Sequence, residues 1–120
     1  MELVLELESV SVTLAEPDDT KHLSVRVSGP PGAAPATHAE RLERVLSGLH
    51  LGRLGRDGDA RLNRDALRFR AAGEVSDDWD ARFEAMCGYA ESKGWVDPVD
   101  GALQAHVEWT PGVPAADAHP

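Results

Sequence analysis

The chain has 120 residues, of which 42% are hydrophobic and 28% are charged, a composition typical of one soluble globular domain. Its formal net charge of −9 argues against nucleic acid or an anionic membrane as a partner, because both favour clustered lysine and arginine. No segment is apolar over the roughly 20 residues that span a bilayer, and no basic segment precedes an apolar one at the start, so neither a membrane helix nor a signal peptide is expected.

The first patterned segment runs from Glu2 to Leu14 and changes phase partway. Its leucines alternate up to Leu7, and the apolar positions then shift by one residue after Glu8 and Ser9. Because strand side chains have a period of two, this slip predicts a bulge or bend. Residues 22–28 alternate cleanly after a turn-forming stretch. We predict that the two segments form an antiparallel hairpin with one solvated face.

Residues 29–36 are rich in glycine and proline and predict a connector. Thr37 and Glu40 have the spacing of a capping box, which predicts that a helix begins there. This helix carries apolar residues at helical spacing and ends at Gly48 or Gly52; the apolar positions are Ala39, Leu42, Val45, Leu46 and Leu49.

Residues 49–72 allow two interpretations. Asp57-Gly58 favours a hairpin, whereas the alternative is a loop followed by a strand at residues 66–70. Eight of the twelve basic residues lie between positions 41 and 70, where the net charge is +4. These arginines either form a local anion site or cover the protein's own acidic surface, and the second interpretation is favoured because most surface charge is solvated or loosely paired.

Nearly all the aromatic residues lie between Ser76 and Trp109. Ser76 is predicted to cap a second helix, and Gly94 to end it in a Schellman motif. A turn over residues 97–101 then leads into a strand over residues 103–109. We predict one contiguous core cluster of Trp79, Phe83, Met86, Trp95 and Trp109.

Together these elements predict an α+β fold with two layers, in which two amphipathic helices pack on one face of a mainly antiparallel sheet. The alternative is a strongly curved sheet that forms a small cone or half-barrel around a pocket. Residues 1–109 are expected to form a single α+β domain. Residues 110–120, with three prolines, are expected to form a flexible C-terminal tail.

The strongest candidate site lies on the predicted last strand. His106 and Glu108 are two residues apart, so their side chains leave the same face about 7 Å apart. A carboxylate beside an imidazole can orient it for general acid or base catalysis. Gln104 extends this row, and His22 and Arg26 could share its surface. The competing interpretation is an ordinary polar outer face of an antiparallel sheet.

Other candidate chemistry is weaker. Cys87, the only cysteine, is expected to be a small core residue and not a nucleophile. Asp57-Gly58-Asp59 resembles the start of a calcium loop, but Arg68 stands where a bidentate glutamate is needed, so a turn is favoured. No metal site and no cofactor are predicted. The chain contains no phosphate-binding glycine loop, no Gly-x-Ser-x-Gly and no Cys-x-x-Cys.

Two functions remain. The first is a small soluble cytoplasmic binding or protein-interaction module without a catalytic motif, acting through the sheet face or an edge strand on a protein partner or as a homodimer. The second is a small-ligand-binding enzyme, such as an isomerase or cyclase, with His106 and Glu108 as its acid/base pair and a small molecule as its partner. The first is favoured. The lone cysteine is compatible with a reducing cytoplasm.

Overall fold

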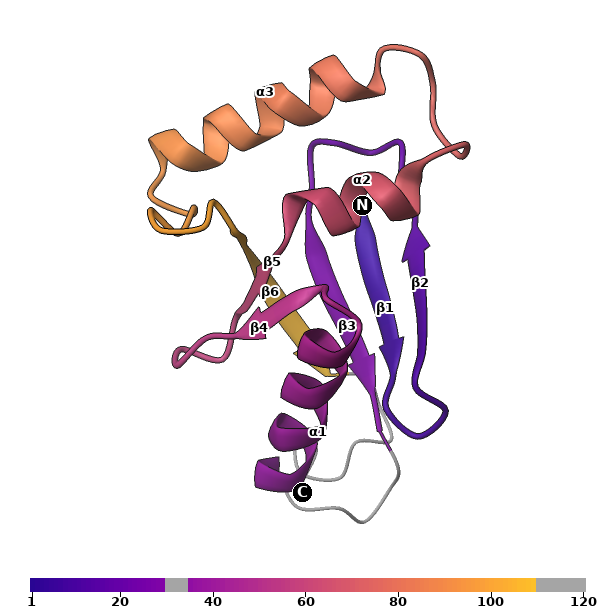
Figure 1. Ribbon diagram of the computed structural model, residues 1–120, viewed down its shortest axis with the longest axis vertical. Coiled ribbons are helices and arrows are strands. Elements are labelled where there is room, and N and C mark those ends of the chain that lie inside the picture. Colours follow the sequence, from indigo (N-terminus) through magenta and orange to yellow (C-terminus); the bar gives the residue numbers. More distant parts are fainter. Residues whose placement is uncertain (30–34, 110–120) are drawn as a thin grey trace.

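The structure, a computed structural model, describes residues 1–29 and 35–109, which form an α+β fold (Figure 1). The predicted class is therefore confirmed, but the sheet is mixed and curled and three helices accompany it. The predicted C-terminal tail and residues 30–34 of the connector lie outside the described residues. The elements are β1 (Glu2–Glu6), β2 (Ser11–Ala15), β3 (Ser24–Ser28), α1 (Pro35–Gly48), β4 (Gly52–Leu54), β5 (Ala60–Leu62), α2 (Arg64–Ala71), α3 (Trp79–Ser92) and β6 (Leu103–Trp109).

The first two strands, β1 and β2, form an antiparallel hairpin. Leu3 lies opposite Leu14, and Leu5 lies opposite Val12, so both pairs place apolar side chains on the same face. The sequence predicted a bulge or bend near Glu8-Ser9, and the structure has a turn there and no bulge. The chain reverses there, and the change of phase marks a turn between two strands.

Strand β3 lies between β1 and β6 and runs parallel to both. The predicted antiparallel pairing of residues 22–28 with the first segment is therefore wrong. Strand β2 already occupies one edge of β1, and β3 runs opposite to β2. The edge of β1 that remains accepts β3 in the parallel direction.

Strand β6 connects the two halves of the sheet, because it is parallel to β3 on one side and antiparallel to β5 on the other. The predicted hairpin around Asp57-Gly58 is confirmed, since β5 pairs with β4 in antiparallel fashion. A Cβ atom on Gly52 would lie 1.9 Å from the carbonyl oxygen of Arg61, so this crossing of β4 and β5 requires glycine. This hairpin turns away from the other strands and curls the sheet (Figure 1).

Helix α1 begins at Pro35, two residues before the predicted cap, so Thr37 lies inside the helix and the capping-box prediction is wrong. Proline suits the first turn of a helix because no intrahelical bond needs its amide. Leu42 and Leu46 are fully buried. The buried ring of His38 stacks on Trp109 at the end of β6, with 5.7 Å between the ring centroids.

Helix α2 replaces the strand that was the alternative for residues 66–70. The side chain of Asn63 accepts hydrogen bonds from the amides of Asp65 and Ala66, at 2.8 and 3.4 Å, and caps the helix. Leu67 is buried, whereas the side chain of Phe69 is 82% exposed. The two apolar residues therefore lie on different sides of a helix, although their spacing of two resembled a strand.

The start of α3 is tied to the loop between β2 and β3. The helix begins at Trp79, so Ser76 is not its cap as predicted. The Ser76 amide instead donates to the Asp18 carboxylate at 3.2 Å, and Arg82 donates to it at 2.6 Å. These bonds hold the pKa of Asp18 below its usual range. The indole of Trp79 donates to the carbonyl of Pro17 at 2.6 Å.

The end of α3 is the predicted Schellman motif. Gly94 has a φ of +77°, which a residue with a Cβ rarely adopts. The Gly94 amide donates to the carbonyl of Glu91 at 3.1 Å, and the Trp95 amide donates to the carbonyl of Ala90 at 2.9 Å. Both this motif and the following turn over residues 97–101 are confirmed.

The core combines buried side chains of the sheet with buried side chains of the three helices. Trp79 and Phe83 stack within it at 4.7 Å between ring centroids, and Met86 and Trp109 pack against it. Trp95 was also predicted to belong to this core cluster, and that prediction is wrong because Trp95 is 45% exposed. The fully buried sheet residues are Leu3, Leu5, Val25, Val27, Ala60, Leu62 and Leu103. None of the described helices is long and apolar enough to cross a membrane.

Phe83→Ala should lower the free energy of unfolding by about 3–5 kcal/mol, because it removes a fully buried ring from the core. Phe69→Ala is the matched control, and its effect should stay within about 0.5 kcal/mol because the ring is exposed. Urea denaturation followed by tryptophan fluorescence measures both values. Similar effects of the two substitutions would show that the assignment of the buried ring is wrong.

Candidate functional site

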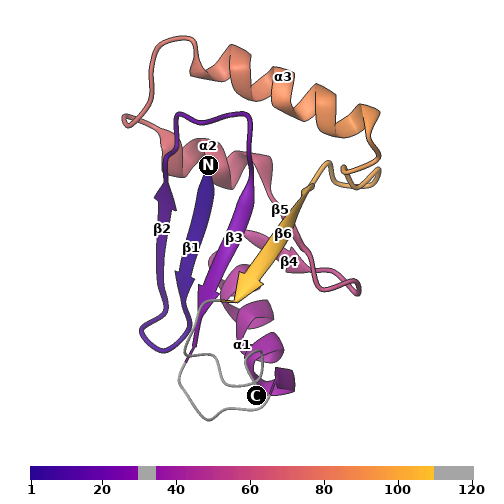
Figure 2. The ribbon, with the colours of Figure 1, turned by 180° about the vertical axis from the view of Figure 1, so that it is seen from behind.

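The predicted site residues Gln104, His106 and Glu108 lie on β6, on the side of the sheet opposite the core. Ala105 and Val107, which alternate with them, are buried. None of the described helices crosses this side of strands β2, β1, β3 and β6, which faces the viewer in Figure 2. We call it the outer face, and its central residues are Glu2, Val4, Ser24, Arg26, Gln104, His106 and Glu108.

The parallel pairing of β3 and β6 places Arg26 on this face, as the sequence suggested. Arg26 lies opposite Glu108 in the register, and Ser24 lies opposite His106. The guanidinium of Arg26 donates to the carboxylate of Glu2 on β1 at 3.2 Å. Neighbouring strands therefore bring cationic and anionic side chains together in rows across the outer face.

The carboxylate that contacts His106 belongs to Asp59, which precedes β5. One of its oxygens lies 3.3 Å from Nδ1 of the imidazole, and the other accepts from the side-chain amide of Gln104 at 2.9 Å. The structure thus gives Asp59 the place that was predicted for Glu108. Sequence reasoning missed this residue because the pairing of β5 with β6 joins segments more than forty positions apart, and the only local signal was the hairpin turn.

His22 precedes β3 and lies in the loop that follows β2. Its side chain is 81% exposed, and its Nδ1 atom lies 3.2 Å from the carboxylate of Asp19 in the same loop. The structure thus gives His22 a local partner three residues away, and the described hydrogen bonds of His106 do not involve it.

The turn that presents Asp59 is held by Asp57. The carboxylate of Asp57 accepts from the Asp59 amide at 3.0 Å and from Arg61 at 3.1 Å, and Gly58 has a φ of +88°. The hydrogen bond from Arg61 and that from the Asp59 amide lower the pKa of Asp57. This segment is therefore an ordinary turn, as the sequence favoured, and it fixes Asp59 beside β6.

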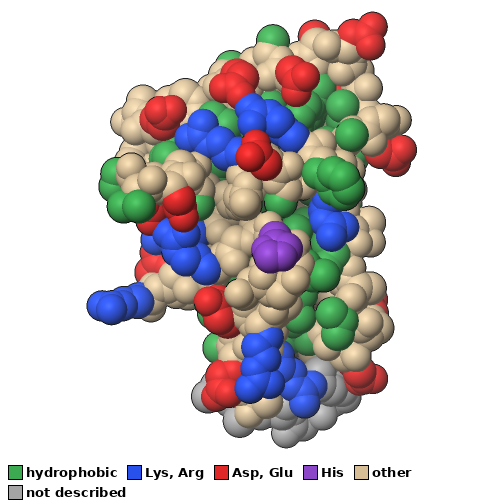
Figure 3. Space-filling view, in the orientation of Figure 1, with side chains coloured by type: hydrophobic (Ala, Val, Ile, Leu, Met, Phe, Trp, Pro, Cys, Tyr) green, Lys and Arg blue, Asp and Glu red, His purple; other side chains and the backbone are tan. Residues whose placement is uncertain are grey.

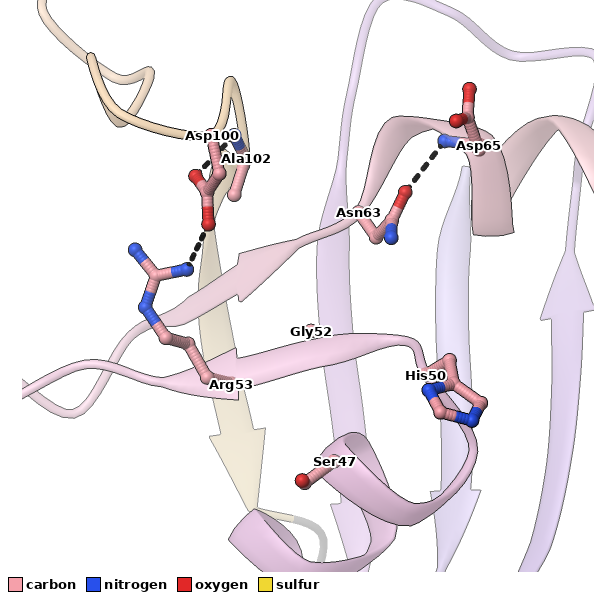
Figure 4. A pocket seen from close by; sticks show the side chains of 8 residues that line it. All are labelled: Ser47, His50, Gly52, Arg53, Asn63, Asp65, Asp100 and Ala102. Carbon is pink, nitrogen blue, oxygen red and sulfur yellow. Dashed lines mark hydrogen bonds and ion pairs between the residues drawn. The ribbon is translucent and has the colours of Figure 1, made fainter.

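A separate cavity of about 430 Å³ opens where α1 ends, β4 begins and α2 begins (Figure 4). His50 lies between α1 and β4, lines the cavity and has a φ of +57°. Its polar groups largely bind one another. Arg53 donates to Asp100 at 2.6 Å and also contacts Asp97. The Ala102 amide and Arg53 hold the pKa of Asp100 below its usual range. The lining residues are Ser47, His50, Gly52, Arg53, Asn63, Asp65, Asp100 and Ala102.

The arginines of residues 41–70 mainly contact the protein's own carboxylates. Arg61 pairs with Asp57 at 3.1 Å, and Arg64 lies 3.8 Å from Glu91. Arg68 contacts Glu84. Figure 3 shows basic and acidic side chains interspersed on the face seen in Figure 1. This supports the interpretation that these arginines cover an acidic surface, and not the anion-site interpretation.

Cys87 lies on the buried side of α3. Cys87 is 1% exposed, and burial raises the pKa of its thiol. Because the thiolate is the nucleophilic form, both observations make the side chain unreactive. The sequence-based interpretation of Cys87 as a core residue is confirmed.

Searches of protein-family models, curated proteins and solved structures found no match to this chain. Among residues 1–29 and 35–109, no three histidine, cysteine or acidic side chains converge as metal ligands would. The chemistry that the outer face itself offers is an exposed imidazole with a carboxylate, an amide, and paired charges on neighbouring strands. Such groups can donate and accept hydrogen bonds to a docked molecule.

Cys87 should react slowly with a thiol reagent in the folded protein, because its side chain is buried and its thiolate is disfavoured. Labelling should become complete when the protein is unfolded in urea. Mass spectrometry after timed exposure to iodoacetamide measures the modified fraction. Rapid stoichiometric labelling under native conditions would refute the burial of this thiol.

Proposed function

We propose that this protein is a small binding or protein-interaction module that docks a second copy of itself on the outer face. The observation that carries the proposal is the outer face itself, a continuous side of four strands that none of the described helices covers. Sheet faces are usually solvated on one side, so its polarity is compatible with a monomer as well as an interface. The arrangement of its charges favours the interface.

The charges on the outer face are of both signs and alternate between strands. Arg26 contacts Glu2 and lies in register with Glu108, while His106 contacts Asp59. A two-fold interface uses the same patch on both subunits, so such a patch must complement itself. A face with one sign of charge would repel its copy, whereas this one can pair Arg26 with Glu108 across the axis.

The edge strand of this face, β2, supports the same proposal. Strand β2 is at the end of the sheet and has the sequence Ser-Val-Thr-Leu-Ala, without charge or proline. Edge strands usually carry charged residues or proline, which protect them against pairing with another chain. A docked copy that overlaps β2 would shield it.

The lone Cys87 suits a reducing compartment, so we place this assembly in the cytoplasm.

The alternative proposal is an isomerase or cyclase that uses His106 and Glu108 on a small molecule. It would need the imidazole to be enclosed with its substrate, because excluding water strengthens acid/base chemistry. The side chain of His106 is 71% exposed, and the carboxylate in contact with it is Asp59. The cavity at Arg53 is lined by other residues. These observations favour the interaction module.

Arg26→Glu should weaken self-association by about tenfold or more, because it places like charges opposite each other across the interface. His106→Ala should weaken it less and should keep its unfolding free energy within about 0.5 kcal/mol of the wild type. Arg26→Glu also places like charges beside Glu2 and Glu108 within one chain, so it should lower the unfolding free energy by about 1 kcal/mol and still leave the chain folded. Sedimentation velocity over a concentration series measures the association, and thermal melts measure the fold. Phe69→Ala, which changes an exposed residue on α2, is the control.

Three results would count against the proposal. A wild-type chain that stays monomeric at the highest concentration would remove the second copy as its partner. Association unchanged by Arg26→Glu would place the interface elsewhere. Unfolding of His106→Ala would show that this side chain belongs to the core and that the assignment of the outer face is wrong.

A further inference from the structure

A narrow cleft lies between the second half of α3 and the starts of β3 and β6. Its volume is about 120 Å³. Helix α3 forms one wall, and the residues just before β3 and at the start of β6 form the other. We call it the aromatic cleft, and its lining residues are Lys21, Leu23, Met86, Tyr89, Ala90, Trp95, Leu103 and Gln104.

Two exposed aromatic side chains form its rim. Tyr89 is 58% exposed and Trp95 is 45% exposed, and their rings meet edge to face with 6.0 Å between centroids. Tyrosine and tryptophan on a surface are the residues that most often dominate the free energy of protein binding. The burial of Phe83 on the same helix shows that α3 has a separate core side, so Tyr89 is not needed there.

The backbone fixes the rim before any ligand arrives. The Trp95 amide donates to the carbonyl of Ala90 at 2.9 Å, and the Trp95 carbonyl accepts from the Gln104 amide at 2.8 Å. The backbone of Trp95 is therefore held between the Schellman motif and the start of β6. A site whose aromatic groups are already positioned loses less conformational entropy on binding.

The volume of the cleft determines the kind of ligand. Pockets for cofactors and drug-sized molecules measure roughly 300–1,000 Å³, so 120 Å³ is too small for these. The cleft has room for a few water-sized groups. This is the space of one aliphatic side chain, such as leucine. The ligand is then a peptide that inserts a single anchor residue.

The charge around the cleft determines what flanks that anchor. The chain has a net charge of −9 and only two lysines. One lysine lines the cleft, and the other lies beside Tyr89 at its rim. Lys21 lines the cleft, and Nζ of Lys93 lies 5.5 Å from the centroid of the Tyr89 ring. The ion pairs of the described residues are made by arginines, histidines and the amino terminus, and by neither lysine.

We propose that the aromatic cleft binds an acidic peptide segment of a partner protein. One aliphatic side chain enters between Tyr89, Trp95 and Met86, and carboxylates beside it lie near Lys21 and Lys93. Carboxylate Asp19 binds the amide of Lys21 and not its ammonium group, which remains able to meet the ligand. The inference is independent of self-association through the outer face, with which the cleft shares only Gln104.

Selection of a random nine-residue peptide library on the immobilised full chain tests this inference. The enriched peptides should carry one leucine, isoleucine or methionine with aspartate or glutamate within two positions. A synthetic copy of the most enriched peptide should bind about tenfold more weakly to Trp95→Ala and to the double variant Lys21→Glu, Lys93→Glu. Raising the salt concentration should weaken its binding to the wild type.

Matched variants separate this site from the outer face. Arg26→Glu and Phe69→Ala should leave peptide binding unchanged, and Trp95→Ala should leave self-association unchanged. Tyr89→Ser gives a second test if Trp95→Ala fails to keep its wild-type melting transition, because the tyrosine ring is largely exposed. Failure to enrich any peptide, enrichment of basic peptides, or equal binding by the cleft variants would overturn the inference. Weaker self-association of Trp95→Ala would instead assign the cleft to a second copy.

Discussion

The position of β6 in the sheet determines most of what this protein presents to other molecules. The last strand of the described chain lies inside the sheet, parallel to β3 and antiparallel to β5. Its alternation sends Ala105 and Val107 into the core and His106 to the outer face. If β6 were at an edge, the N-terminal strands and the β4–β5 hairpin would form separate sheets. Each would bury little apolar surface alone.

The two proposed surfaces both follow from how β6 begins and where it runs. Its start is fixed by a backbone hydrogen bond from Gln104 to Trp95, and both residues line the aromatic cleft. Its outer side chains meet Asp59 on one side and lie in register with β3 on the other. A small fold of this kind can hold two binding surfaces on one rigid frame, because strands position side chains more precisely than loops do.

The sequence predicted the local elements better than the way they pair. The Schellman motif at Gly94 and the hairpin at Asp57-Gly58 are local signals, and both were confirmed. The parallel course of β3 could not be predicted, because alternation specifies which side chains share a face and not which strand lies beside another. Helix α2 was missed because Leu67 and Phe69 resemble a strand, while Asn63 gave a capping signal that was not used. The site residues on β6 followed from alternation, but Asp59 did not, since its contact depends on long-range pairing.

The most direct test of the outer face as the docking surface is the distance between two spin labels in the associated protein. Ser24→Cys places a label on this face, beside His106 in the register, and Phe69→Cys places one on the exposed side of α2. Cys87 is buried and leaves the added cysteine as the reactive one. Two sheets stacked face to face lie about 10 Å apart, so pulsed electron paramagnetic resonance should give a short intersubunit distance for position 24 and a longer one for position 69. A short distance at position 69 with none at position 24 would contradict the account.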